Sequence, residues 1–290
     1  MQGRTDLALE QHEIHKDLPN GVKVEKYNKC GAKVTKIEIT NEDGAAALSK
    51  PIGTYLTVEV PTFSDNTASE EITCLIKDLI CSMLPKSGNI LAVGLGNKDI
   101  TPDALGPKTA EKLLATRHVC DELKRISGVK FVRGVSVITP GVLGQTGIEA
   151  FDTVKGVTEI INPAAVICID ALASRRLKRL GCTVQISNTG IEPGAGVGNS
   201  RFEISQNTLG IPVIALGVPT VVDAVTLVSD FCKDDFSKAK SSAEPDGRQM
   251  IVTPREIDLL TDRASKLLSD ALNIALQPEF DLELIHEMMS

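Results

Sequence analysis

The chain has 290 residues, with 38 acidic and 31 basic side chains and a net charge of −7. This balance gives no global positive field that would attract nucleic acid, so direct nucleic-acid binding is not expected. No apolar run reaches membrane-spanning length, and the N-terminus lacks the apolar core of a signal peptide, so we expect a cytoplasmic protein with no membrane contact. The seven cysteines are scattered without a CxxC pair, which indicates reduced thiols rather than a disulfide framework or a zinc ribbon.

The N-terminal third predicts an arm, a strand and a helix. The first thirty residues are polar and mixed in charge, which indicates an arm rather than core. Residues 54–60 alternate as TYLTVEV and predict a half-buried strand that ends at Pro61. After Ser69, apolar residues recur at helical spacing up to Leu84, so a helix is expected there.

From residue 89 onward, short apolar strands alternate with helices. The helices are expected to begin near Leu105, to span residues 148–161 and to span residues 221–231. This alternation predicts a single three-layer α/β domain, with a mostly parallel central sheet covered by helices on both faces. The predicted strands cover residues 89–93, 129–138, 164–169, 183–186 and 211–216.

The C-terminal part adds a loop and two helices. Residues 233–247 are charged and rich in small side chains, which predicts a surface loop, and residues 254–290 predict two amphipathic helices. A basic cluster at 175–179 is expected to be a solvated face, although it could equally contact an acidic protein or a neighbouring subunit. With no internal repeat and no convincing linker, one domain is expected.

Two acidic residues follow apolar strands at the edge where an open parallel sheet binds its ligands. Asp170 follows the strand AAVICI, where partial burial would raise its pKa, and Asp103 precedes the helix that begins near Leu105. Two carboxyl groups at adjacent strand ends can divide base and acid work in hydrolysis. Structural alternatives remain open, since Asp103 could be a helix N-cap and Asp170 could pair with Arg175 or Arg176.

Loops rich in glycine and small polar residues follow the other strands and provide candidate substrate contacts. Such loops can be simple flexibility, or backbone that lines a groove for an extended peptide. The loop at 139–147 and the longer loop at 188–199 are expected at the same edge as the two acids. The candidate substrate-binding residues are Asn97, Thr139, Gly141, Gln145, Gly190, Glu192, Gly194, Gly196 and Asn199.

Several other chemistries are disfavoured by the sequence. None of the four histidines falls in a strand-end loop, so a serine or cysteine nucleophile there would lack its base. His12 and His15 are three residues apart rather than four, so they resemble a zinc motif only superficially. Gly94 and Gly96 lack the third glycine of a dinucleotide fingerprint, because position 99 is aspartate. No metal and no cofactor are therefore predicted.

Five long strings occur in the order LAVGLGNKDITPDALGPKTAEKL, GVLGQTGIEAFDTVKG, VICIDALASR, TGIEPGAGVGN and LGIPVIALGVPTVVDA. Together they resemble the germination protease family of spore-forming bacteria, and the resemblance runs from about residue 4 to about residue 230. It implies a fold related to the hydrogenase maturation peptidases and an endopeptidase that degrades small acid-soluble spore proteins during germination. It also implies two catalytic aspartates, which fall on Asp103 and Asp170, and a location in the forespore or spore core.

The same resemblance implies an inactive homotetrameric zymogen that removes its own N-terminus. The string RTDLALE resembles the processing site, which would place the cut between Asp6 and Leu7 and make residues 1–6 a pro-segment of the 7–290 protease domain.

Two alternative functions remain. One is a metal-dependent peptidase of the hydrogenase-maturation type, although this chain has no histidine in the third loop. The other is a non-catalytic α/β binding module.

Overall fold

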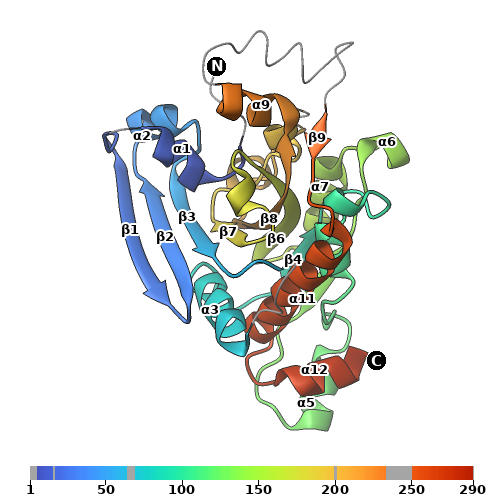
Figure 1. The fold of residues 1–290 in the computed structure, drawn as a ribbon. Helices are drawn as coiled ribbons and strands as arrows, with labels where there is room; N and C mark the ends of the chain where they lie inside the picture. The colour runs from blue at the N-terminus through green and yellow to red at the C-terminus, as the bar shows by residue number, and fades with distance from the viewer. Residues whose placement is uncertain (1–4, 16, 64–68, 199–200, 233–249, 290) are drawn as a thin grey trace.

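The computed structural model describes residues 5–15, 17–63, 69–198, 201–232 and 250–289, which form an α/β domain around one mixed sheet (Figure 1). The sheet runs in the order β1-β2-β3-β7-β8-β6-β4-β5, and β9 pairs with β8. The predicted α/β class is therefore confirmed. Parallel strands form one half of the sheet, and antiparallel strands form the other.

The parallel half contains the strands that carry the predicted site. It consists of β4 (Ile90–Gly94), β5 (Val135–Ile138), β6 (Ala165–Ser174) and β8 (Val213–Asp223). Helices cover both faces of these strands, so they are apolar on both sides, as the runs ILAV and AVICI predicted. Two strands extend past their predicted ends: β6 continues through Asp170 to Ser174, and β8 through Val221 to Asp223. In β8 these residues replace the start of the helix predicted at 221–231.

The antiparallel half contains β1 (Val22–Lys29), β2 (Ala32–Ile39), β3 (Gly53–Glu59) and β7 (Thr183–Ser187). The prediction that the first thirty residues form an arm is wrong. Residues 22–29 form an edge strand, and Leu7, Ala8 and Leu9 are buried, the last two in an apolar cluster with β2 and β3. The hairpin turns at Cys30 and Gly31, both with positive φ, which favours the glycine found there.

Two helical layers complete the domain (Figure 1). One face of the sheet packs on α3 (Glu70–Cys81), α4 (Leu105–Ala110) and the long α11 (Ile257–Leu276), whose apolar stripes build the main core. The opposite face packs on α7 (Ala150–Ile161) and on the chain that follows β7. The helices predicted at 70–84, 105 and 148–161 are thereby confirmed.

Shorter elements connect these layers. A strand was predicted at residues 129–138, but only residues 135–138 form one, β5. The loop predicted at 233–247 lies outside the described residues, and the two C-terminal helices are present as α11 and α12. No helix in the described ranges is both long and apolar enough to cross a bilayer. The remaining elements are α1 (Ala8–Ile14), α2 (Glu42–Leu48), η1 (Thr101–Asp103), α5 (Cys120–Ser127), α6 (Leu143–Thr146), η2 (Leu177–Arg179), η3 (Ala195–Val197), α8 (Gln206–Leu209), α9 (Ala224–Cys232), β9 (Ile251–Val252) and α12 (Leu282–Met289).

Candidate active site

A cavity of about 290 Å³ lies beyond the carboxyl end of β4 and beside the carboxyl-terminal half of β6, near the edge where the parallel strands were expected to place a site. Asp103 and Asp170 both line it, together with Asp6 from the N-terminal segment. Apolar side chains, among them Leu143, Phe151 and Ile191, make up much of the remaining wall. The structure therefore brings the two predicted acids together in one pocket that is largely apolar.

Asp170 lies inside β6 rather than after it, on the face of the sheet opposite the main core. Its side chain is 5 % exposed, and one carboxyl oxygen accepts the N–H of Ala171 at 2.9 Å. Burial raises the pKa of Asp170 well above its ordinary value, and the carboxylates of Asp103 and Asp6 raise it further. The charges that shift the pKa of Asp170 most are thus the carboxylates of Asp103 and Asp6, which argues against a structural pair with Arg175 or Arg176.

Asp103 closes the short helix η1, directly before α4. Its carboxylate accepts the backbone N–H of Asn97 at 2.7 Å, which lowers its pKa, while burial raises the pKa by a larger amount. The N-cap of α4 is Ala104, with no side-chain cap bond, so Asp103 is not the helix cap that remained as its alternative role. Gly96 makes this close approach possible, because a Cβ there would lie 2.1 Å from the carbonyl oxygen of Asp103.

The predicted substrate-binding residues divide between two hollows. Gly141, Glu192 and Gly194 line the cavity with the two acids, whereas Gly190 and again Glu192 line a second hollow of about 260 Å³. Gly190, Glu192 and Gly194 belong to the loop that follows β7. Because β7 is antiparallel to β8, this loop starts at the opposite edge of the sheet from the one expected. The loop reaches the site by running back across the face of β6 and β8, where Ile191 forms a β-bridge with Ile204.

The other predicted residues stand around these hollows rather than in them. Asn97 is buried, and its side-chain oxygen accepts the Nε2–H of Gln145 at 2.9 Å, so this pair links the loops after β4 and β5. Thr139 is exposed and lines neither hollow. Gly196 contacts Asp6 instead of solvent, and Asn199 lies outside the described residues.

The N-terminal segment, which the sequence placed in an arm, is docked beside the acids. The N–H of Asp6 donates to the carbonyl of Ala173 at 2.9 Å, and the N–H of Ala173 donates to the Asp6 carboxylate at 2.7 Å. Gln185 holds the next stretch, since its Nε2 donates to the Asp6 carbonyl at 3.0 Å and its Oε1 accepts the N–H of Ala8 at 2.8 Å. Residues 6–8 are therefore fixed by hydrogen bonds to both β6 and β7.

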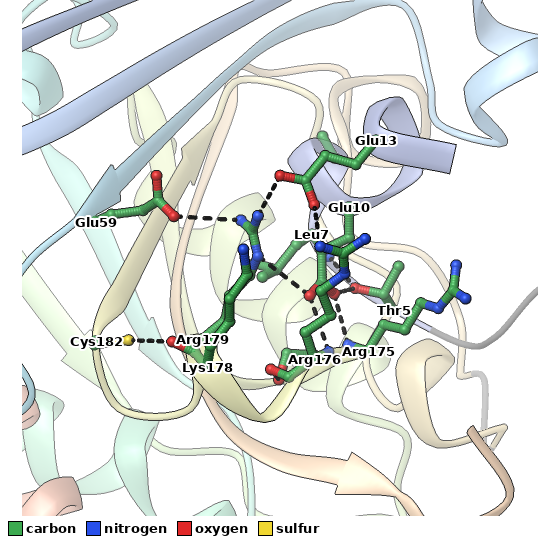
Figure 2. A network of polar contacts seen from close by, with 12 residues as sticks. Thr5, Leu7, Glu10, Glu13, Glu59, Arg175, Arg176, Lys178, Arg179 and Cys182 are labelled. Atoms are coloured by element: carbon green, nitrogen blue, oxygen red, sulfur yellow. Dashed lines mark hydrogen bonds and ion pairs between the residues drawn. The ribbon is translucent and has the colours of Figure 1, made fainter. Parts of the chain in front are cut away.

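A buried ionic network anchors this segment on its other side (Figure 2). Glu10 is 2 % exposed, and its carboxylate accepts the N–H groups of Arg175 and Arg176 at 2.6 and 3.0 Å and the hydroxyl of Thr5 at 2.5 Å. The Arg179 side chain, 2 % exposed, lies 3.3 Å from Glu10. The basic cluster predicted as a solvated face is thus partly interior, and it binds the chain's own N-terminal helix.

Within the ranges that the structure describes, no three His, Cys, Asp or Glu side chains gather closely enough to hold a metal ion. The sequence signal that could have found the additional residues, Glu10 and Gln185, is absent, because each acts on a partner more than forty residues away in the chain.

Comparison with known proteins identifies the class as a peptidase. A family model described as germination protease matches residues 4–238. The chain is 42% identical to the germination protease of Clostridium perfringens, with 99% of each chain covered, and 36% identical to that of Priestia megaterium, with 97% and 95% covered. The chain therefore belongs to the germination protease family. A solved [NiFe] hydrogenase maturation protease, HycI from Thermococcus kodakarensis KOD1, aligns at 16% identity with a TM-score of 0.40 over 68% of this chain and 98% of that one.

Proposed function

We propose that this chain is an aspartate-dependent endopeptidase that degrades small acid-soluble spore proteins during germination, and that it is made as a zymogen which releases residues 1–6. The observation that carries the proposal is the pair Asp103 and Asp170, both with raised pKa, in one cavity that the chain's own Asp6 also lines. The family supports the peptidase class, and the pair supplies the chemistry.

The two carboxyl groups have different surroundings, and this assigns their roles. Asp170 is the more deeply buried of the two, and its neighbours are carboxylates, so it retains its proton and serves as the acid. Asp103 is half-buried, and its pKa is raised by burial but by no neighbouring charge, so it is the first of the two to ionise and serves as the base. The charge states of the two groups are coupled. An ionised Asp103 raises the pKa of Asp170, so it favours the protonated form of Asp170.

The reaction follows from these states. Asp103 takes a proton from water, the water oxygen bonds to the peptide carbonyl carbon, and Asp170 gives its proton to the carbonyl oxygen. The C–N bond then breaks as Asp103 passes its proton to the leaving nitrogen. One of the two hydroxyl groups on the carbon returns its proton to Asp170 and becomes the carbonyl oxygen of the product. The products are a carboxylic acid and an amine, and both aspartates recover their starting states.

Self-processing is supported by how residues 5–8 are bound. Gln185 donates to the carbonyl oxygen of Asp6, which belongs to the peptide bond proposed to be cut. A donor at this oxygen stabilises the negative charge that develops on it during hydrolysis. Leu7 is fully buried at the start of α1, so the new N-terminus is expected to remain docked after the cut. A homotetramer and a location in the spore core complete the proposal on the strength of the family resemblance.

Cleavage of a small acid-soluble spore protein tests the proposal. Wild type is compared with Asp103→Asn and Asp170→Asn, and intact-mass spectrometry follows both the substrate and the chain's own N-terminus. Each variant is expected to lose at least about 10²-fold in kcat/KM, because one proton-transfer group is missing. The matched control is Asp258→Asn, an exposed position in the first turn of α11, which is expected to cleave at the wild-type rate.

Size-exclusion chromatography with light scattering on the same preparations reports the subunit number. Cleavage at the wild-type rate by either active-site variant would contradict the proposed pair. A mass four times that of the chain supports the tetramer, and a monomer would remove it from the proposal.

A further inference from the structure

The carboxylate of Asp6 occupies a place made for it by backbone groups. One of its oxygens accepts the N–H of Ala173 at 2.7 Å, and the backbone N–H of Gly196 lies close enough to act to lower the pKa of the carboxyl group. A Cβ at position 196 would lie 2.1 Å from that same oxygen, so only glycine allows the loop to approach so closely. Two backbone donors that converge on one buried carboxylate are an anion-binding arrangement.

A lysine lines the same hollow as this carboxylate. Lys50 follows α2 and lines the second hollow together with Asp6 and Glu192. Burial lowers the pKa of Lys50, and the carboxylates of Asp6 and Glu192 act on it in the opposite direction. Burial likewise raises the pKa of Asp6, while the charge of Lys50 acts to lower it. Among the residues that the structure describes, Lys50 forms no ion pair within 4.0 Å, and it lines a hollow of about 260 Å³ that leaves room for an acidic side chain longer than that of Asp6.

Asp6 also stands between the two hollows. It lines both, as do Leu172, Ile191 and Glu192. Once residues 1–6 leave, the wall that Asp6 forms is gone, and the cavity with Asp103 and Asp170 opens toward Lys50. The vacated position then holds two free backbone donors and one ammonium group beside the catalytic carboxyls.

We propose that Lys50 and the N–H groups of Ala173 and Gly196 form a subsite that binds the acidic side chain of the residue preceding the cut bond. Lys50 is the residue that distinguishes this side chain from its neutral amide. The inference rests on the proposed endopeptidase function and deepens it, because Asp6 is the first occupant of the subsite and the acidic residue of a protein substrate is the next. The backbone donors alone would accept an amide oxygen as well as a carboxylate, so the charge of Lys50 must provide the discrimination.

A double-mutant cycle on self-release tests the subsite. Wild type, Asp6→Asn, Lys50→Met and the double variant are incubated, and the loss of residues 1–6 is timed by intact mass. We expect Asp6→Asn to slow release at least about tenfold in wild type and less than about threefold in the Lys50→Met chain. The charge-exchanged chain with Asp6→Lys and Lys50→Glu is expected to recover part of the lost rate. Lys23→Met, an exposed lysine on β1, is the control and is expected to change nothing.

The same cycle read by urea unfolding separates the subsite from the chemistry. In an Asp103→Asn background, which keeps residues 1–6 attached, the two substitutions are expected to be non-additive by at least about fivefold in the unfolding equilibrium constant. If no chain releases its N-terminus and the unfolding cycle is non-additive, the endopeptidase proposal fails but the carboxylate subsite stands. If the effects are additive in both measurements, Lys50 does not recognise the carboxylate and the inference is overturned.

Discussion

Removal of the Glu10 carboxylate should loosen the docked N-terminal segment. Glu10→Ala deletes the acceptor of two backbone N–H groups and the nearest carboxylate to the Nε of the buried Arg179 (Figure 2). Hydrogen bonds to a charged group are each worth about 1.5–3 kcal/mol, and truncating one partner of a buried ion pair costs about 3–5 kcal/mol. Because Glu13 and Glu59 still lie within 4.0 Å of Arg179, the lower end applies, and we expect a loss of about 3 kcal/mol in the free energy of unfolding.

The assay is urea unfolding of chains that also carry Asp103→Asn, so that the N-terminus stays attached. Glu13→Ala is the matched control. It removes a carboxylate that is 28% exposed at its side chain and accepts no backbone N–H from Arg175 or Arg176, so a loss of about 1 kcal/mol or less is expected. A loss below about 1 kcal/mol for Glu10→Ala would refute the reasoning, because the network would then not hold the segment.

Three further predictions follow from the same contacts. Gly196→Ala should slow release of residues 1–6 at least about tenfold by intact mass, since its Cβ would displace Asp6, while Gly144→Ala meets nothing within 4 Å and should release normally. Burial raises the pKa of Asp170, so the stabilising effect of its proton is present at low pH and is lost as pH rises through the raised pKa. Asp170→Asn should therefore stabilise the fold by at least about 1.4 kcal/mol at pH 7, and by much less at pH 3, in urea unfolding. Gln185→Leu removes hydrogen bonds to residues 6 and 8 and should cost about 1–3 kcal/mol in the same assay, and an unchanged midpoint would show that those bonds do not hold the segment.

The parts of the site that depend on local pattern could be predicted from the sequence. The apolar runs ILAV and AVICI predict two buried strands, and a parallel sheet places the residues near their ends at one edge, so Asp103 and Asp170 could be paired from the sequence alone. The prediction that Asp170 follows its strand is wrong, because β6 continues to Ser174. The extension ALAS consists mostly of small side chains, and pairing with β8 rather than local preference keeps it extended.

The rest of the site depends on contacts between distant parts of the chain. Glu10 and Lys50 are ordinary surface types, and only their partners at Arg179 and Asp6 give them a role. The arm was predicted because the first thirty residues are polar and mixed in charge. The structure shows that Glu10 is buried and lies 3.3 Å from the buried Arg179, which composition cannot indicate.

The account's central claim is that Asp103 and Asp170 together perform the hydrolysis. The most direct measurement is the first-order rate at which the purified chain loses residues 1–6, followed by intact mass in wild type, Asp103→Asn and Asp170→Asn. The account predicts release in wild type and a rate at least about 10²-fold lower in both variants, each of which remains folded by circular dichroism. Release at the wild-type rate in either folded variant would contradict it.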